Sequence, residues 1–136
     1  MSLRLAAVSG ALLLLAGCGG GSDHMTSPPQ TPTLLDVQAA VFAPRCAISG
    51  CHVGSGAPFH LDLSSASASA ASIIGVASSE MPSLARVEPF DASQSYLYRK
   101  ITADPTILGD PMPASGGPLS ASQIALIQDW IDAGAP

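Results

Sequence analysis

Two cysteines and a histidine lie within residues 46–52, and they constrain the fold of this 136-residue chain more than any other feature. Their order is a cysteine, four intervening residues, a second cysteine and then directly a histidine. The rest of the chain offers few large side chains for a core, since it has three Phe, two Tyr and one Trp against 13 Gly and 12 Pro. A domain of about 100 residues with so little to bury is marginally stable alone. We therefore expect a cofactor or a cross-link to complete its core.

The segment 46–52 has the residue types that attach haem covalently. Two thiols can add across the two vinyl groups of a porphyrin, and a histidine directly after the second cysteine can donate a ring nitrogen to the iron. The more common spacing leaves two residues between the cysteines, whereas four intervene here, and the flexible residues Ser49 and Gly50 allow them to loop outward. The segment predicts one covalent haem held by Cys46 and Cys51, with His52 as an iron ligand.

The sequence around this motif resembles a family of small exported cytochrome-c-like domains. The similar segments occur in order between Val37 and Ala135, at residues 41–45, 61–64, 95–101, 112–113 and 130–135. The resemblance implies an all-α fold with long loops, in which a few helices surround one covalent haem. It also implies electron transfer rather than enzymatic catalysis, and it implies Met112 as the second axial ligand of the iron.

The second axial position has other candidates. Met81 is also followed by a proline, and His60 lies eight residues beyond His52. A thioether ligand opposite a histidine raises the reduction potential by favouring ferrous iron. If none of Met112, Met81 and His60 binds the iron, the second axial position is open and would permit peroxide or gas binding.

Apolar residues spaced three to four apart predict helices throughout, and no segment shows the alternation of a strand. The expected helices cover residues 34–42, 65–76, 92–101 and a last segment from Ser120. Pro44 should lie at or just beyond the end of the first helix. Residues 103–118 contain many prolines and glycines, and we expect a long irregular loop there.

The last helix has the clearest signals. Ser120 followed by Gln123 is a capping-box pattern, and Gly134 provides a stop. Trp130 is expected to pack this helix against Phe42 of the first helix.

The first residues carry the signals of an exported lipoprotein. Arg4 precedes an apolar run over residues 5–16, which is too short to span a bilayer as a helix and reads as a signal peptide. Residues 15–18 resemble the lipobox that ends in a lipidated cysteine, here Cys18. We expect residues 1–17 to be the lipoprotein signal peptide, 18–33 a flexible linker and 34–136 the cytochrome-c-like domain. The lipid would anchor it on the periplasmic side of a bacterial membrane, and a glycine after Cys18 points to the outer membrane.

The formal net charge of −5 excludes a basic nucleic-acid-binding surface. Arg99 and Lys100 are expected to face solvent, with the haem propionates as alternative partners. The sequence therefore predicts a membrane-anchored monohaem c-type cytochrome that transfers electrons between redox partner proteins of the cell envelope.

Two alternatives make other use of the cysteines. A Cys46–Cys51 disulfide would give a haem-free envelope lipoprotein that acts as a binding or structural module. Cys46, Cys51, His52 and His60 could instead bind zinc.

Overall fold

The computed structural model describes residues 30–136, so the predicted signal peptide, Cys18 and most of the predicted linker lie outside the described residues. The described part is helical and contains no strand, which confirms the all-α prediction at that level. Its helices are α1 (Leu34–Val37), η1 (Gln38–Cys46), η2 (Gly54–Gly56), η3 (Pro58–His60), α2 (Ala66–Ile73), η4 (Ala92–Gln94), α3 (Tyr96–Ile101) and α4 (Ala121–Asp132). Within residues 30–136, none of these helices has the length and apolar character needed to cross a membrane.

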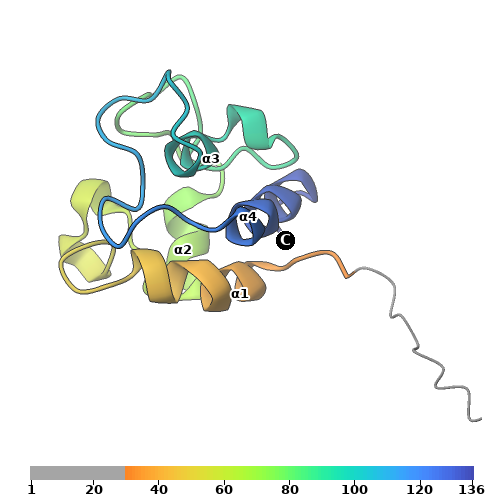
Figure 1. Cartoon of the computed structure of the whole chain (residues 1–136), viewed down its shortest axis with the longest axis horizontal. Coiled ribbons are helices and arrows are strands. Elements are labelled where there is room, and N and C mark those ends of the chain that lie inside the picture. The colour runs from red at the N-terminus through yellow and green to blue at the C-terminus, as the bar shows by residue number, and fades with distance from the viewer. Residues whose placement is uncertain (1–29) are drawn as a thin grey trace, which may run out of the picture.

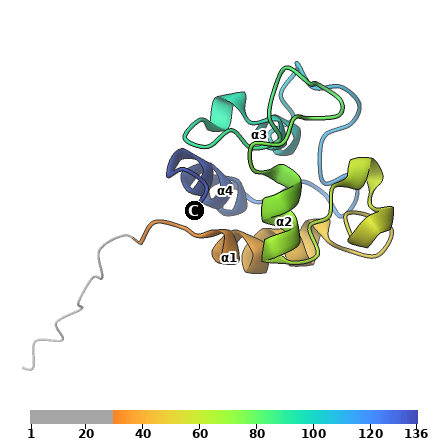
Figure 2. The ribbon, with the colours of Figure 1, turned by 180° about the vertical axis from the view of Figure 1, so that it is seen from behind.

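The helices pack around α1 and η1, which form one continuous helix (Figure 1). Helices α2 and α4 both contact α1, and α3 contacts α4. Figure 2 shows from behind how α2 crosses over the helix formed by α1 and η1. The loop of residues 103–118 connects α3 to α4 and swings out to the side of the molecule away from the C-terminus (Figure 1).

The core joins the first helix to the last through two aromatic side chains. Phe42 and Trp130 are both fully buried, and their rings meet edge to face with centroids 6.5 Å apart. The indole N–H of Trp130 also donates a hydrogen bond to the Pro136 carbonyl, at 3.0 Å. This confirms the predicted packing of Trp130 on Phe42, and it ties the C-terminus of the chain to its first helix.

The expectation that the first helix ends at Pro44 is wrong. Pro44 lies inside η1, a π-helix that continues to Cys46. In an α-helical register the missing N–H of Pro44 would leave the Ala40 carbonyl without a partner. That carbonyl instead accepts a hydrogen bond from the Gln123 side chain of α4, at 3.1 Å. The wider π-helical turn, with Ala47 N–H bonded to the Phe42 carbonyl at 2.7 Å, then carries the helix as far as the first cysteine.

The predicted helix over residues 92–101 is divided in two. It consists of η4 and α3, separated at Ser95, whose ψ of 116° is extended. The Ser95 hydroxyl accepts from Glu88 N–H at 2.8 Å and donates to the Asp91 carbonyl at 2.9 Å, so the break has its own hydrogen bonds. The other predicted elements agree better, because α2 lies within residues 65–76 and residues 103–118 form an irregular loop.

Helix α4 starts with the predicted capping box. The Ser120 hydroxyl accepts from Gln123 N–H at 3.2 Å, and the Gln123 side chain accepts from Ser120 N–H at 3.1 Å. Replacing Ser120 with alanine removes the first of these bonds and should lower the free energy of unfolding by about 1 kcal/mol. Urea denaturation measures the change. Ser122→Ala should cost less, because the Ser122 hydroxyl bonds only to the Ser120 hydroxyl, at 3.0 Å, and caps no backbone N–H. Equal effects of the two variants would contradict this role of Ser120.

Candidate functional site

A cavity of about 300 Å³ lies between the end of η1, helix η3, the segment between α2 and η4, helix α3 and the loop 103–118. Its volume is at the lower end of the usual range for cofactor and small-molecule sites, about 300–1,000 Å³. All four haem-binding residues predicted from the sequence line it: Cys46, Cys51, His52 and Met112. The first three are neighbours in the sequence, whereas Met112 comes from a distant loop, so the fold is what brings it to them.

Hydrogen bonds fold the segment 46–52 back onto the end of η1. The Cys46 carbonyl accepts from His52 N–H at 3.2 Å, and Cys51 N–H donates to the Ile48 carbonyl at 2.9 Å. The intervening residues Ser49 and Gly50 are exposed, and Gly50 has a φ of 82°, which glycine adopts without strain. The four residues between the cysteines thus loop outward, while both cysteines stay at the cavity.

The hydrogen bonding of the His52 imidazole is compatible with a metal ligand. Its Nδ1 lies 3.2 Å from the Leu61 carbonyl, and because a carbonyl only accepts, Nδ1 carries the proton. Nε2 therefore keeps its lone pair, and a backbone carbonyl on the other ring nitrogen is the usual support of a metal-bound histidine. Burial lowers the pKa of His52, which favours the neutral ring that can bind a metal.

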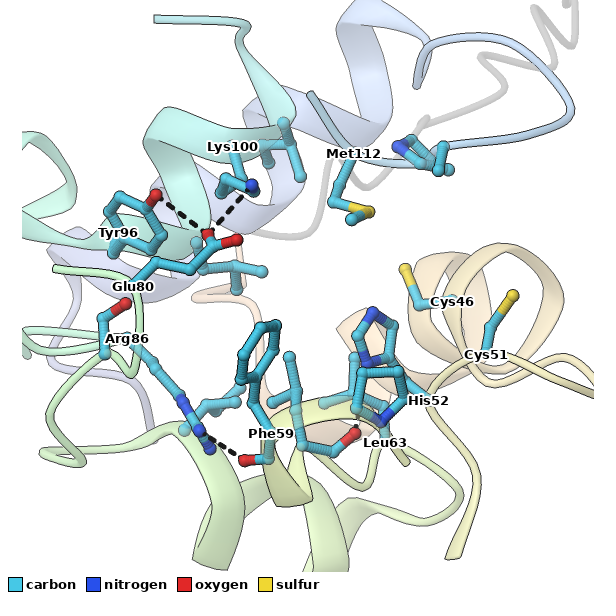
Figure 3. Close-up of a pocket in the computed structure, with 18 of the residues that line it drawn as sticks. Cys46, Cys51, His52, Phe59, Leu63, Glu80, Arg86, Tyr96, Lys100 and Met112 are labelled. Atoms are coloured by element: carbon cyan, nitrogen blue, oxygen red, sulfur yellow. Dashed lines mark hydrogen bonds and ion pairs between the residues drawn. The ribbon is translucent and has the colours of Figure 1, made fainter. Parts of the chain in front are cut away.

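Of the three side chains considered for the second axial position, the structure brings Met112 to His52. Figure 3 shows the Met112 thioether pointing into the cavity from the wall opposite the His52 imidazole, with the Cys46 thiol between the two. Met81 and His60 do not line the cavity, and His60 is exposed. The sequence spacing could not separate these candidates, because each of them lies outside the helices that it predicts.

The described structure gives no support to the zinc alternative. Within the described residues 30–136, no three His, Cys, Asp or Glu side chains gather closely enough to hold a metal ion. His60, the fourth ligand of that hypothesis, is turned to the surface. Cys46 and Cys51 are both free thiols in the structure.

Charged side chains reach the cavity at places that the sequence analysis missed. Arg45, Glu80 and Arg86 line it, and the expected solvent exposure of Lys100 is wrong. Lys100 is only 7% exposed, because its ammonium lies 3.0 Å from the Glu80 carboxylate and donates to the Leu108 carbonyl at 2.8 Å. Helical periodicity could not reveal this pair, since Glu80 stands in an irregular segment.

Arg86 forms the opposite polar wall of the cavity. Its guanidinium donates to the Ser72 carbonyl at 2.7 Å and to the Phe59 carbonyl at 2.8 Å (Figure 3 shows the second bond). Burial lowers the pKa of Arg86, yet arginine stays charged throughout the range in which proteins fold. A cofactor that carries acidic groups would find this cation at the edge of an otherwise mainly apolar cavity.

The Cys46 thiol should be unreactive in the folded, haem-free chain. Burial raises its pKa to about 11 from 9.0, so at pH 8 it holds about a hundredfold less thiolate than a free cysteine. In a variant with Cys18 and Cys51 replaced by serine, iodoacetamide should modify Cys46 slowly and accelerate up to pH 11. Addition of urea should remove the protection, and equal rates with and without urea would contradict the burial of this thiol.

No family model, curated protein or solved structure matches the chain, and its function is therefore inferred from the geometry of this cavity.

Proposed function

We propose that the protein is a membrane-anchored monohaem c-type cytochrome, an electron carrier between redox proteins of the cell envelope. The observation that carries the proposal is the meeting of Cys46, Cys51 and His52 with Met112 at one cavity. Two thiols for covalent attachment, one imidazole and one thioether are the complete protein ligand set of a histidine–methionine c-type haem.

The residues of the cavity fit such a haem. Cys46 and Cys51 would form the two thioethers, and His52 and Met112 would hold the iron. The mainly apolar walls, which include Leu63 and Ile73 in the core, suit a porphyrin ring. When bound, the haem supplies reversible one-electron chemistry at its iron.

The chain contributes an oriented imidazole and a mainly apolar site. The hydrogen bond from His52 to the Leu61 carbonyl would hold the imidazole in one orientation in both the oxidised and the reduced protein. Apolar walls exclude water, whose reorientation would otherwise accompany each change of charge. If His52 and Met112 both held the iron, a small molecule would have to displace one of them before it could react, which would favour electron transfer over catalysis.

The proposal is tested on protein produced with a cytochrome c maturation system. We expect one reversible one-electron wave in voltammetry, and we expect the reduced protein not to bind carbon monoxide. A reduced protein that binds carbon monoxide readily would contradict the electron-carrier function and favour gas sensing or peroxide chemistry. A colourless protein with a Cys46–Cys51 disulfide would favour the haem-free envelope module instead.

The anchor is tested separately. If Cys18 carries the lipid, Cys18→Ser should move the folded domain from the membrane fraction to the soluble fraction, because one residue then holds the whole anchor. Immunoblots of the two fractions, compared with those of Ser22→Ala, measure the change. A Cys18→Ser protein that still sediments with membranes would contradict the lipoprotein proposal without affecting the haem proposal.

A further inference from the structure

The loop that carries Met112 is held without a hydrophobic anchor. No residue from 102 to 118 is fully buried, and Leu108, its leucine, is 52% exposed. The next buried side chain is Leu119, directly before α4. Since apolar burial is the usual way to fix a loop, the position of Met112 depends on polar contacts with the rest of the fold.

Side chains of α3 provide these contacts on both sides of one residue. The Leu108 carbonyl accepts from the Lys100 ammonium at 2.8 Å, and Leu108 N–H donates to the Tyr96 hydroxyl oxygen at 3.0 Å. Four residues later, Met112 N–H donates to the backbone carbonyl of Lys100 at 2.9 Å. The backbone on the N-terminal side of Met112 is thereby bonded to two successive turns of α3.

Glu80 orients both α3 side chains. One of its carboxylate oxygens accepts from the Tyr96 hydroxyl at 2.9 Å and lies 3.0 Å from the Lys100 ammonium (Figure 3). The tyrosine has one hydroxyl proton, and donating it to Glu80 leaves a lone pair free to accept from Leu108 N–H. Lys100 is only 7% exposed, and the Glu80 carboxylate is the ionic partner of its ammonium.

We propose that Glu80, Tyr96 and Lys100 are positioning residues that hold Met112 in the cavity as the axial ligand. They act on the loop backbone, and none of them is required to touch the iron. The inference rests on the proposed function, because it assigns these residues a role toward the same site. A second anchor, Arg45 of η1, donates to the Gly117 carbonyl at 2.7 Å on the far side of Met112. The contacts with α3 include the Met112 N–H itself, so they hold the loop nearer to the ligand than the Arg45 bond does.

The test uses Tyr96→Phe, which keeps the ring and removes the oxygen that Leu108 N–H needs. Tyr98→Phe is the matched control, because Tyr98 lies on the same helix but donates to Gln128 of α4 instead. Glu80→Gln provides a second variant, with Glu88→Gln on the exposed surface as its control. Amide hydrogen exchange of Leu108 and Met112 reports the loop, and carbon monoxide binding to the reduced protein reports the axial ligand.

We expect both amides to exchange on the order of tenfold faster in Tyr96→Phe and Glu80→Gln than in the controls. The fraction of reduced protein that binds carbon monoxide should rise by a similar factor. Unchanged exchange would overturn the proposal, and so would faster exchange with an intact methionine–iron charge-transfer band. If the unaltered protein has this band and the variants keep it, only the positioning role fails. A haem-free unaltered protein would overturn the proposed function and this inference together.

Discussion

Replacing Met112 with alanine should lower the reduction potential by on the order of 0.1 V, within the roughly 0.8 V that axial ligands span. The thioether is a soft ligand that favours ferrous iron, and its loss removes that preference. The oxidised variant should also lose the sulfur-to-iron charge-transfer absorption, and the reduced variant should bind carbon monoxide. The expectation follows from the position of Met112 at the cavity wall opposite His52.

Met81→Ala and His60→Ala are the controls for this experiment. Neither side chain lines the cavity, so both variants should keep the potential and the spectrum of the unaltered protein. If Met112 only packed against its neighbours, Met112→Ala would lower the stability modestly and leave the spectrum unchanged. That outcome for Met112→Ala would contradict the assignment of the axial ligand.

Replacing Trp130 with alanine should lower the free energy of unfolding by about 3–5 kcal/mol, the cost typical of deleting a buried aromatic side chain. The indole is fully buried, meets the Phe42 ring edge to face and donates to the Pro136 carbonyl. The resulting void would also loosen η1, which carries Cys46 at its end. Denaturant titration of the haem-loaded protein, followed by circular dichroism, measures the loss.

Trp130→Phe separates the two contributions of this residue. It keeps an apolar ring in the core and loses the hydrogen bond, so its cost should be clearly smaller than that of the alanine variant. Equal costs would show that the bond to Pro136, rather than packing on Phe42, holds α4 in place.

Local signals in the sequence are sufficient for much of the fold. The capping box at Ser120, the stop at Gly134 and the pairing of Trp130 with Phe42 depend on neighbouring residues or on one apolar face, and the structure confirms them. The position of Pro44 inside a helix does not follow from local signals, because it depends on Gln123, a residue distant in sequence that donates to the Ala40 carbonyl. A local rule about proline cannot include such a partner.

In the candidate site, too, some residues could be recognised from local sequence and others only from the tertiary fold. Cys46, Cys51 and His52 could be recognised as a group because their chemistry depends on adjacency in the sequence. Met112 required the resemblance to a family, since a loop without helical period gives no position in space. Glu80 and Lys100 could not be paired from the sequence, because an irregular segment and a helix meet there only through the tertiary fold.

The most direct test of the central claim is the intact mass of the protein under denaturing conditions, after production with a cytochrome c maturation system. A covalent haem at Cys46 and Cys51 predicts a species heavier than the processed, lipid-bearing polypeptide by the mass of one haem. Peptide mapping should place that mass on residues 46–52, and replacing both cysteines with alanine should abolish it. A polypeptide without haem and two hydrogen atoms lighter than the free dithiol, bridged between Cys46 and Cys51, would contradict the account.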